Sequence, residues 1–126
     1  MPAPTVLIVD DDDSIREITQ LALEMVGGWT VVSANGGAQA LELAREHKPD
    51  AVLLDVMMPD MDGPTTFRHL QADETTRHIP VILLTAKVQV GDRQVWDDLD
   101  VVGVIPKPFD PMQLTTEVAQ MLHWDT

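Results

Sequence analysis

The sequence predicts an α/β fold in which a single parallel sheet of five strands carries helices on both faces. Five short runs rich in valine, isoleucine and leucine recur along the chain without alternating with polar residues, as is typical of strands buried on both faces. Segments of helical periodicity lie between these runs. A length of 126 residues accommodates one domain, so we expect one domain over residues 1–126 with no output domain.

The expected strands are Thr5–Val9, Thr30–Ser33, Ala51–Leu54, Pro80–Leu84 and Val101–Ile105. Right-handed crossovers between parallel strands leave few topologies, and the flavodoxin-like strand order 2-1-3-4-5 is favoured among them. Pro106 fits this order at an edge strand, because proline lacks the N–H that a central strand would need.

The first helix is expected to bury Ile15, Ile18, Leu21, Ala22 and Met25, which share one helical face. Gly27–Gly28 should end it. Asp12 and Asp13 lie where the helix begins and can cap its free backbone N–H groups. Ser14-x-x-Glu17 also matches the pattern of a capping box.

Four further segments have helical character. One ends before Pro49, and a shorter one contains Phe67 and Leu70. A terminal helix is indicated by Leu114, Val118, Met121 and Leu122. Val88–Leu99 carries only a partial apolar stripe.

The composition excludes several classes of function. The formal net charge of −13 argues against nucleic acid or an anionic membrane as a direct partner. The chain has no cysteine, so neither disulfides nor thiolate metal sites can form. The N-terminus lacks the features of a signal peptide, and no apolar run approaches the roughly 18 residues that a membrane span requires. We expect a cytoplasmic protein.

Polar residues follow four of the five expected strands. Asp10 and Asp11 follow the first strand, Asp55 the third and Thr85 the fourth, while Lys107 lies just past the fifth. Ligands of such sheets bind outside the carboxyl ends of the strands, so these residues should meet at one edge.

Three carboxylates at one edge repel one another unless a cation lies between them. Mg²⁺ suits them because it is a hard cation with oxygen ligands. The cation, the Lys107 ammonium and the Thr85 hydroxyl would together bind a phosphoryl group. One of the carboxylates could itself be the nucleophile and form an aspartyl phosphate.

Four motifs, each behind its own strand, resemble those of a known family. They are VDD at Val9–Asp11, LLDVMMPDMDG at Leu53–Gly63, LLTA at Leu83–Ala86 and KPFDP at Lys107–Pro111. Over nearly its whole length the chain resembles the receiver domain of two-component response regulators, in the single-domain form of chemotaxis regulators. The resemblance implies a switch that a phosphoryl group activates, and not an enzyme that turns over a separate substrate.

The resemblance also implies roles for the acidic residues. Asp55 would accept the phosphoryl group. Asp11, Asp55 and the backbone carbonyl of Met57 would ligate Mg²⁺, and Asp10 would act through a metal-bound water. Asp60 and Asp62 are interpreted instead as turn-forming residues ahead of Gly63.

Around the phosphoryl group, Lys107 would bridge to Asp55, while Thr85 and the Ala86 backbone N–H would donate hydrogen bonds. The bond between Lys107 and Pro108 is cis in the family. The implied partners are a sensor histidine kinase or a histidine phosphotransfer protein, and a downstream protein target. Docking is expected on the first helix around Ile15 and Arg16 and on the Pro108–Phe109 loop.

One departure concerns Val104, where many receivers carry an aromatic residue that reports phosphorylation. We therefore expect the signal to pass through the Thr85–Lys87 loop and the Val88–Leu99 segment. Two alternative functions make different demands on the sequence. A phosphatase of the haloacid dehalogenase type would need an aspartate at Met57. A pseudo-receiver, which binds partners without being phosphorylated, would usually have lost the acid pair, the acceptor or the lysine, and this chain keeps all three.

Overall fold

The computed structural model describes residues 3–86 and 99–124 and has a parallel sheet in the order β2-β1-β3-β4-β5. In chain order the elements are β1 Thr5–Val9, α1 Asp13–Gly27, β2 Thr30–Ala34, α2 Gly37–His47, β3 Ala51–Asp55, α3 Gly63–Ala72, β4 Val81–Thr85, β5 Gly103–Pro106 and α4 Pro111–Leu122. The predicted fold class and strand order are confirmed. The expected helix within 88–99 falls almost wholly outside the described residues.

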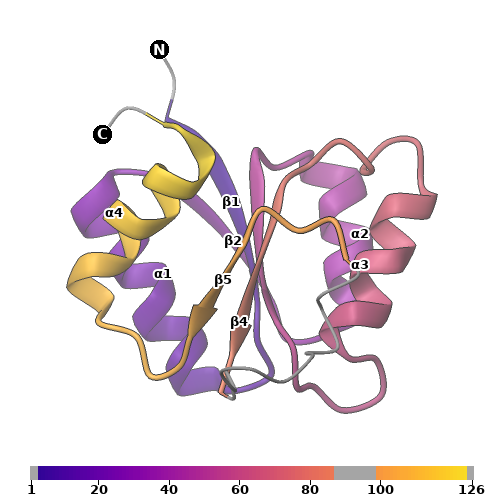
Figure 1. Cartoon of the computed structure of the whole chain (residues 1–126), viewed down its shortest axis with the longest axis horizontal. Coiled ribbons are helices and arrows are strands. Elements are labelled where there is room, and N and C mark those ends of the chain that lie inside the picture. The colour runs from indigo at the N-terminus through magenta and orange to yellow at the C-terminus, as the bar shows by residue number, and fades with distance from the viewer. Residues whose placement is uncertain (1–2, 87–98, 125–126) are drawn as a thin grey trace.

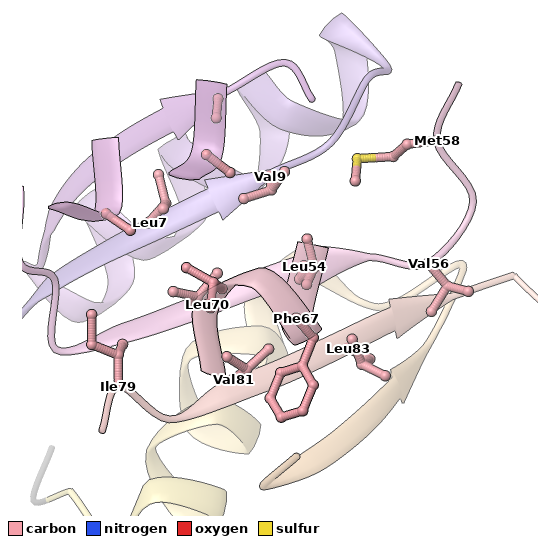
Figure 2. Close-up of a cluster of buried hydrophobic side chains, with 14 residues drawn as sticks. Leu7, Val9, Leu54, Val56, Met58, Phe67, Leu70, Ile79, Val81 and Leu83 are labelled. Carbon is pink, nitrogen blue, oxygen red and sulfur yellow. The ribbon is translucent and has the colours of Figure 1, made fainter. Parts of the chain in front are cut away.

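Helices cover both faces of the sheet. Helices α1 and α4 lie on one face, and α2 and α3 lie on the other (Figure 1). Because neighbouring side chains of a strand point to opposite faces, each central strand contributes to two cores. The α2–α3 side contains Leu7, Leu54 and Leu83 together with Phe67 and Leu70 (Figure 2).

The other core lies beneath α1 and α4. It contains Ile8, Leu53 and Leu84 from the strands, with Leu23 and Leu114 from the helices. Burial on both faces explains why the central strands β1, β3 and β4 are continuous apolar runs in the sequence.

Four strands end one residue further along the chain than expected, and in β3 and β4 this extension affects the polar edge. Asp55 is the last residue of β3 and pairs with Leu84, while Thr85 is the last residue of β4 and pairs with Pro106. The expectation that both residues follow their strands was wrong by one position. Both are consequently fixed by the backbone pairing of the sheet.

The start of α1 also differs from the prediction. Asp12 is the N-cap, and its side chain accepts a hydrogen bond from the Ile15 backbone N–H at 3.1 Å. The predicted capping box is wrong, because the helix already begins at Asp13 and Ser14 lies inside its first turn. The helix ends as expected before Gly28, whose φ of 69° is the left-handed conformation that glycine adopts at low cost.

The predicted buried face of α1 is largely wrong. Ile18, Leu21 and Met25 are 50%, 55% and 80% exposed. The buried residues of α1 are instead Thr19, Ala22 and Leu23. Thr19 can be buried because its hydroxyl donates to a backbone carbonyl one turn earlier, that of Ile15, at 2.7 Å. As a consequence, an apolar stripe of α1 is left on the surface. No helix within residues 3–86 and 99–124 is both long and apolar enough to cross a membrane.

Candidate functional site

The register of the sheet brings the predicted polar residues to one edge. Val9 pairs with Leu54, so Asp10 and Asp55 come next on adjacent parallel strands. On the other side of β3, the Lys107 backbone N–H donates to the carbonyl of Thr85 at 2.7 Å. Residues that are far apart in the sequence are therefore aligned by strand pairing, as was expected for this architecture.

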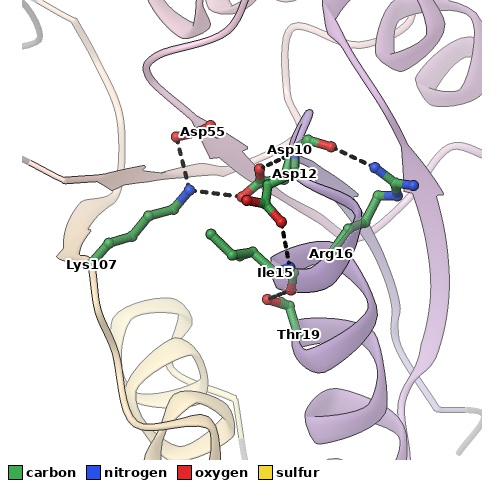
Figure 3. A network of polar contacts seen from close by, with 7 residues as sticks. All are labelled: Asp10, Asp12, Ile15, Arg16, Thr19, Asp55 and Lys107. Atoms are coloured by element: carbon green, nitrogen blue, oxygen red, sulfur yellow. Dashed lines mark hydrogen bonds and ion pairs between the residues drawn. The ribbon is translucent and has the colours of Figure 1, made fainter.

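The Lys107 ammonium lies between two buried carboxylates (Figure 3). Its Nζ is 2.8 Å from Oδ2 of Asp10 and 3.1 Å from Oδ1 of Asp55. The Asp10 side chain is fully buried, that of Asp55 is 8% exposed and that of Lys107 is 13% exposed. At this depth the ion pairs are screened little by solvent, so they hold both carboxylates firmly.

A third carboxylate completes the cluster on its solvent side. Asp10, Asp11 and Asp55 each offer an oxygen, and these oxygens lie within 4.8 Å of one another. Asp11 is exposed, whereas the other two are buried. Three hard oxygen donors around one small space suit a divalent cation such as Mg²⁺. One lysine leaves this group with a net charge of −2, which a divalent cation would neutralise.

The environment perturbs the ionisation of two of these groups. Burial, opposed by Lys107 and reinforced by the charges of Asp10 and Asp11, raises the pKa of Asp55 from 3.8 to about 6. Burial lowers the pKa of Lys107, but its hydrogen bond to Asp10 and the charge of Asp55 outweigh this effect and raise it overall. Lys107 therefore stays charged at neutral pH, while Asp55 is costly to ionise in the absence of a metal.

The backbone after Asp55 folds back tightly against its own strand. The Gly63 N–H donates to the carbonyl of Val56 at 2.9 Å, and a Cβ at Gly63 would collide with the Asp55 carbonyl oxygen. Glycine is thus required for the close approach. As interpreted from the sequence, Asp62 forms the turn ahead of Gly63; it caps α3 by accepting from the Thr65 N–H at 2.8 Å.

The remaining predicted residues lie around this cluster. Thr85 is 2% exposed at the end of β4, and Ala86 is exposed beside it. Met57 follows Asp55 by two residues with its side chain 70% exposed, and the Lys107–Pro108 bond is cis, as expected. Val104 packs partly buried against the α2–α3 core. Lys87, the last residue of the expected signalling loop, falls outside the described residues.

Sequence reasoning missed two contacts of the site. Lys107 was expected to bridge to Asp55, and its shorter contact to Asp10 was not foreseen. Arg16, which is expected at the docking surface, donates a hydrogen bond to the backbone carbonyl of Asp10 at 2.9 Å, and this contact was not foreseen. An arginine one turn after an acidic strand end is a signal that could have suggested this second contact.

Comparison with known proteins places these motifs in a family. The family model described as response regulator receiver domain matches residues 6–119. The chain is 39% identical over 118 residues to the probable transcriptional regulator ycf27 of Guillardia theta, covering 94% of this chain and 45% of that protein. It is 38% identical over 123 residues to the phosphate regulon transcriptional regulatory protein PhoB of Pseudomonas aeruginosa, covering 98% and 53%. The chain thus spans about half the length of these relatives.

Solved structures show the same architecture. The chemotaxis protein CheY4 of Vibrio cholerae superposes with a TM-score of 0.86 at 28% identity, covering 94% of this chain and 98% of that one. The receiver domain of the sensor histidine kinase PA1611 from Pseudomonas aeruginosa superposes with a TM-score of 0.85 at 27% identity, covering 96% and 98%. That receiver has a magnesium ion coordinated in its active site cleft.

The raised pKa of Asp55 predicts that Asp55→Asn stabilises the metal-free protein. A carboxyl whose pKa rises on folding favours the folded state below its unfolded pKa of 3.8, and loses that contribution as the pH rises through about 6. In EDTA at about pH 7.5, Asp55→Asn should therefore increase the free energy of unfolding by about 1–3 kcal/mol. Urea denaturation measures this difference.

The same difference should shrink as the pH falls from about 6 toward about 4, because Asp55 then becomes neutral in the folded protein. Asp100→Asn removes an exposed carboxylate at the other end of the sheet and should change the stability little. A gain from Asp55→Asn that did not depend on pH would contradict the burial of a charged Asp55.

Proposed function

Because the chain belongs to the response regulator receiver domain family, we propose that it is a phosphorylation-activated switch of a two-component system or phosphorelay. The observation that carries this proposal is the position of Asp55, buried beside the Lys107 ammonium and within 4.8 Å of two further carboxylates. A carboxylate that is held at the edge of a sheet, next to groups that neutralise phosphoryl oxygens, is arranged for nucleophilic attack on phosphorus.

In the proposed reaction a carboxylate oxygen of Asp55 attacks the phosphorus of a phosphohistidine. The new O–P bond forms as the P–N bond breaks, and the electron pair of that bond stays on the imidazole nitrogen. Lys107 already contacts Asp55 at 3.1 Å and would neutralise a phosphoryl oxygen there. Thr85 and the Ala86 N–H, which lie at the end of β4, would donate to the other oxygens.

Mg²⁺ fits the three carboxylates and, when bound, would supply the charge neutralisation that phosphoryl transfer requires. We propose Asp11, Asp55 and the Met57 carbonyl as its direct ligands. Both oxygens of Asp10 already accept hydrogen bonds, Oδ1 from the Asp12 N–H and Oδ2 from Lys107. This supports a role for Asp10 through a metal-bound water.

Incubation with acetyl phosphate, followed by measurement of the intact mass, tests the proposed reaction. We expect the mass to increase by one phosphoryl group in the wild type with Mg²⁺, and not in EDTA or in Asp55→Asn. Asp60→Asn changes an exposed aspartate of the loop that follows Asp55, and this variant should be phosphorylated like the wild type. If the wild type gained no mass from acetyl phosphate and a titration showed no binding of beryllofluoride, the pseudo-receiver alternative would replace the switch.

We further propose that the phosphoryl donor docks on an apolar surface beside the site, which we call the α1–α4 surface. Two hollows of about 530 and 430 Å³ run along it and share Ile18 and Pro111. The larger hollow reaches Lys107, while the smaller extends along α1 past Leu21 to Met25. A protein seated on this surface would therefore also cover the phosphorylation site.

Charge narrows the class of partner. The exposed charged residues of α1 and α4 are all acidic, namely Asp13, Glu17, Glu24 and Glu117. The one arginine of these helices, Arg16, contacts the Asp10 carbonyl and the Asp13 carboxylate. A second copy of this acidic chain would be repelled. The surface suits a helix that has an apolar face flanked by lysine or arginine, as part of a histidine kinase or phosphotransfer protein.

Leu21→Lys tests this docking surface. A lysine there would interrupt the apolar stripe and repel a basic partner, so phosphoryl transfer from a phosphorylated histidine phosphotransfer domain should slow by about tenfold. Transfer from acetyl phosphate should not change, because Leu21 lies outside the chemical site. Val102→Lys alters an exposed apolar residue elsewhere, at 43% exposure. Equal slowing in the two variants would reject the surface.

A further inference from the structure

Arg16 lies in the first turn of α1 and holds the loop that carries the clustered carboxylates. Its Nη1 donates to the backbone carbonyl of Asp10 at 2.9 Å, and its Nη2 donates to the carboxylate of Asp13 at 2.6 Å. The side chain is only 19% exposed. Figure 3 shows the guanidinium reaching from the helix to the start of the loop. The two contacts therefore fix the loop at both ends, at Asp10 and at Asp13.

Asp11 lies between these two anchored residues and depends on them for its position. Its side chain makes no hydrogen bond or ion pair with any residue of 3–86 or 99–124. Its place is set by the two peptide groups that flank it. Arg16 holds the carbonyl of Asp10 before it, and Oδ1 of Asp10 accepts from the Asp12 N–H after it at 2.9 Å.

From these contacts we propose that Arg16 is a positioning residue of the metal site, which keeps Asp11 close enough to Asp55 for both to bind one Mg²⁺ ion. The inference rests on the metal site of the proposed function but concerns a residue outside the ligand set. Lysine cannot replace Arg16, because a single ammonium cannot reproduce the planar fork that reaches both the carbonyl and the carboxylate.

The charge of Arg16 and its positioning role affect Mg²⁺ binding in opposite directions. A nearby guanidinium repels the cation, so loss of the charge alone would tighten binding. Loss of the support would weaken binding, because the four neighbouring carboxylates of Asp10–Asp13 repel one another and Asp11 is no longer held in place. The direction of the change in affinity therefore separates the two effects.

Calorimetric titration of the whole chain with Mg²⁺ tests the proposal in Arg16→Lys and Arg16→Ala. We expect the dissociation constant to rise by about tenfold or more in both variants, which is the usual effect of removing a group that orients a metal ligand. Arg45→Lys and Arg45→Ala are matched controls, because Arg45 of α2 pairs with Asp73, the residue that follows α3, away from the site. They should bind Mg²⁺ like the wild type.

A second measurement separates positioning from general damage to the fold. Phosphorylation of Arg16→Lys by acetyl phosphate should be slow at low Mg²⁺ and should reach the wild-type rate when Mg²⁺ is saturating, whereas a misfolded variant would not recover.

In the calorimetric titration, tighter Mg²⁺ binding in Arg16→Ala with wild-type binding in Arg16→Lys would overturn the proposal in favour of a simple charge effect. Unchanged affinity in both variants would also overturn it. Failure of the wild type to bind Mg²⁺ would instead remove the metal site itself.

Discussion

The ammonium of Lys107, placed between two buried carboxylates, is the interaction on which the rest of this site depends. Asp10 and Asp55 lie side by side at the ends of adjacent strands, and Asp11 adds a third negative charge. One lysine cannot balance three carboxylates, so the site keeps a net charge of −2 that favours binding of a divalent cation. Burial, reinforced by the negative charges of Asp10 and Asp11, raises the pKa of Asp55 to about 6 in the metal-free protein. The shortage of positive charge among these clustered side chains thus favours metal binding and makes Asp55 costly to ionise without a metal.

The fold holds these crowded carboxylates together by fixing the backbone of the segments around them. Parallel pairing sets the positions of Asp55 and Thr85, and the Lys107 N–H is bonded to the carbonyl of Thr85. Gly63 lets the following loop close against the Asp55 strand. The two hydrophobic cores stabilise the sheet from both faces, so the energetic cost of crowded charges at one edge is offset elsewhere in the domain.

The sequence predicted the sheet well because its central strands β1, β3 and β4 are buried on both faces, and such strands are recognisable as continuous apolar runs. The parallel topology places the carboxyl ends of the strands at one edge of the sheet. For this reason Asp10, Asp55 and Lys107 could be grouped from the sequence alone. The orientation of α1 was predicted incorrectly, because Ile18, Leu21 and Met25 form a second apolar stripe, and periodicity alone does not say which stripe faces the sheet. The contact between Lys107 and Asp10 was not foreseen, because it joins residues 97 positions apart and depends on a tertiary distance that no spacing rule encodes.

A direct test of this account is the ionisation of Asp55, followed by carboxyl-carbon NMR as a function of pH in EDTA and again with saturating Mg²⁺. A buried carboxylate that shares one lysine with Asp10 should titrate near pH 6 without metal. It should titrate well below that value when Mg²⁺ neutralises the cluster. A pKa near 3.8 in EDTA, unaltered by Mg²⁺, would mean that Asp55 is an ordinary solvated carboxylate and would contradict the account.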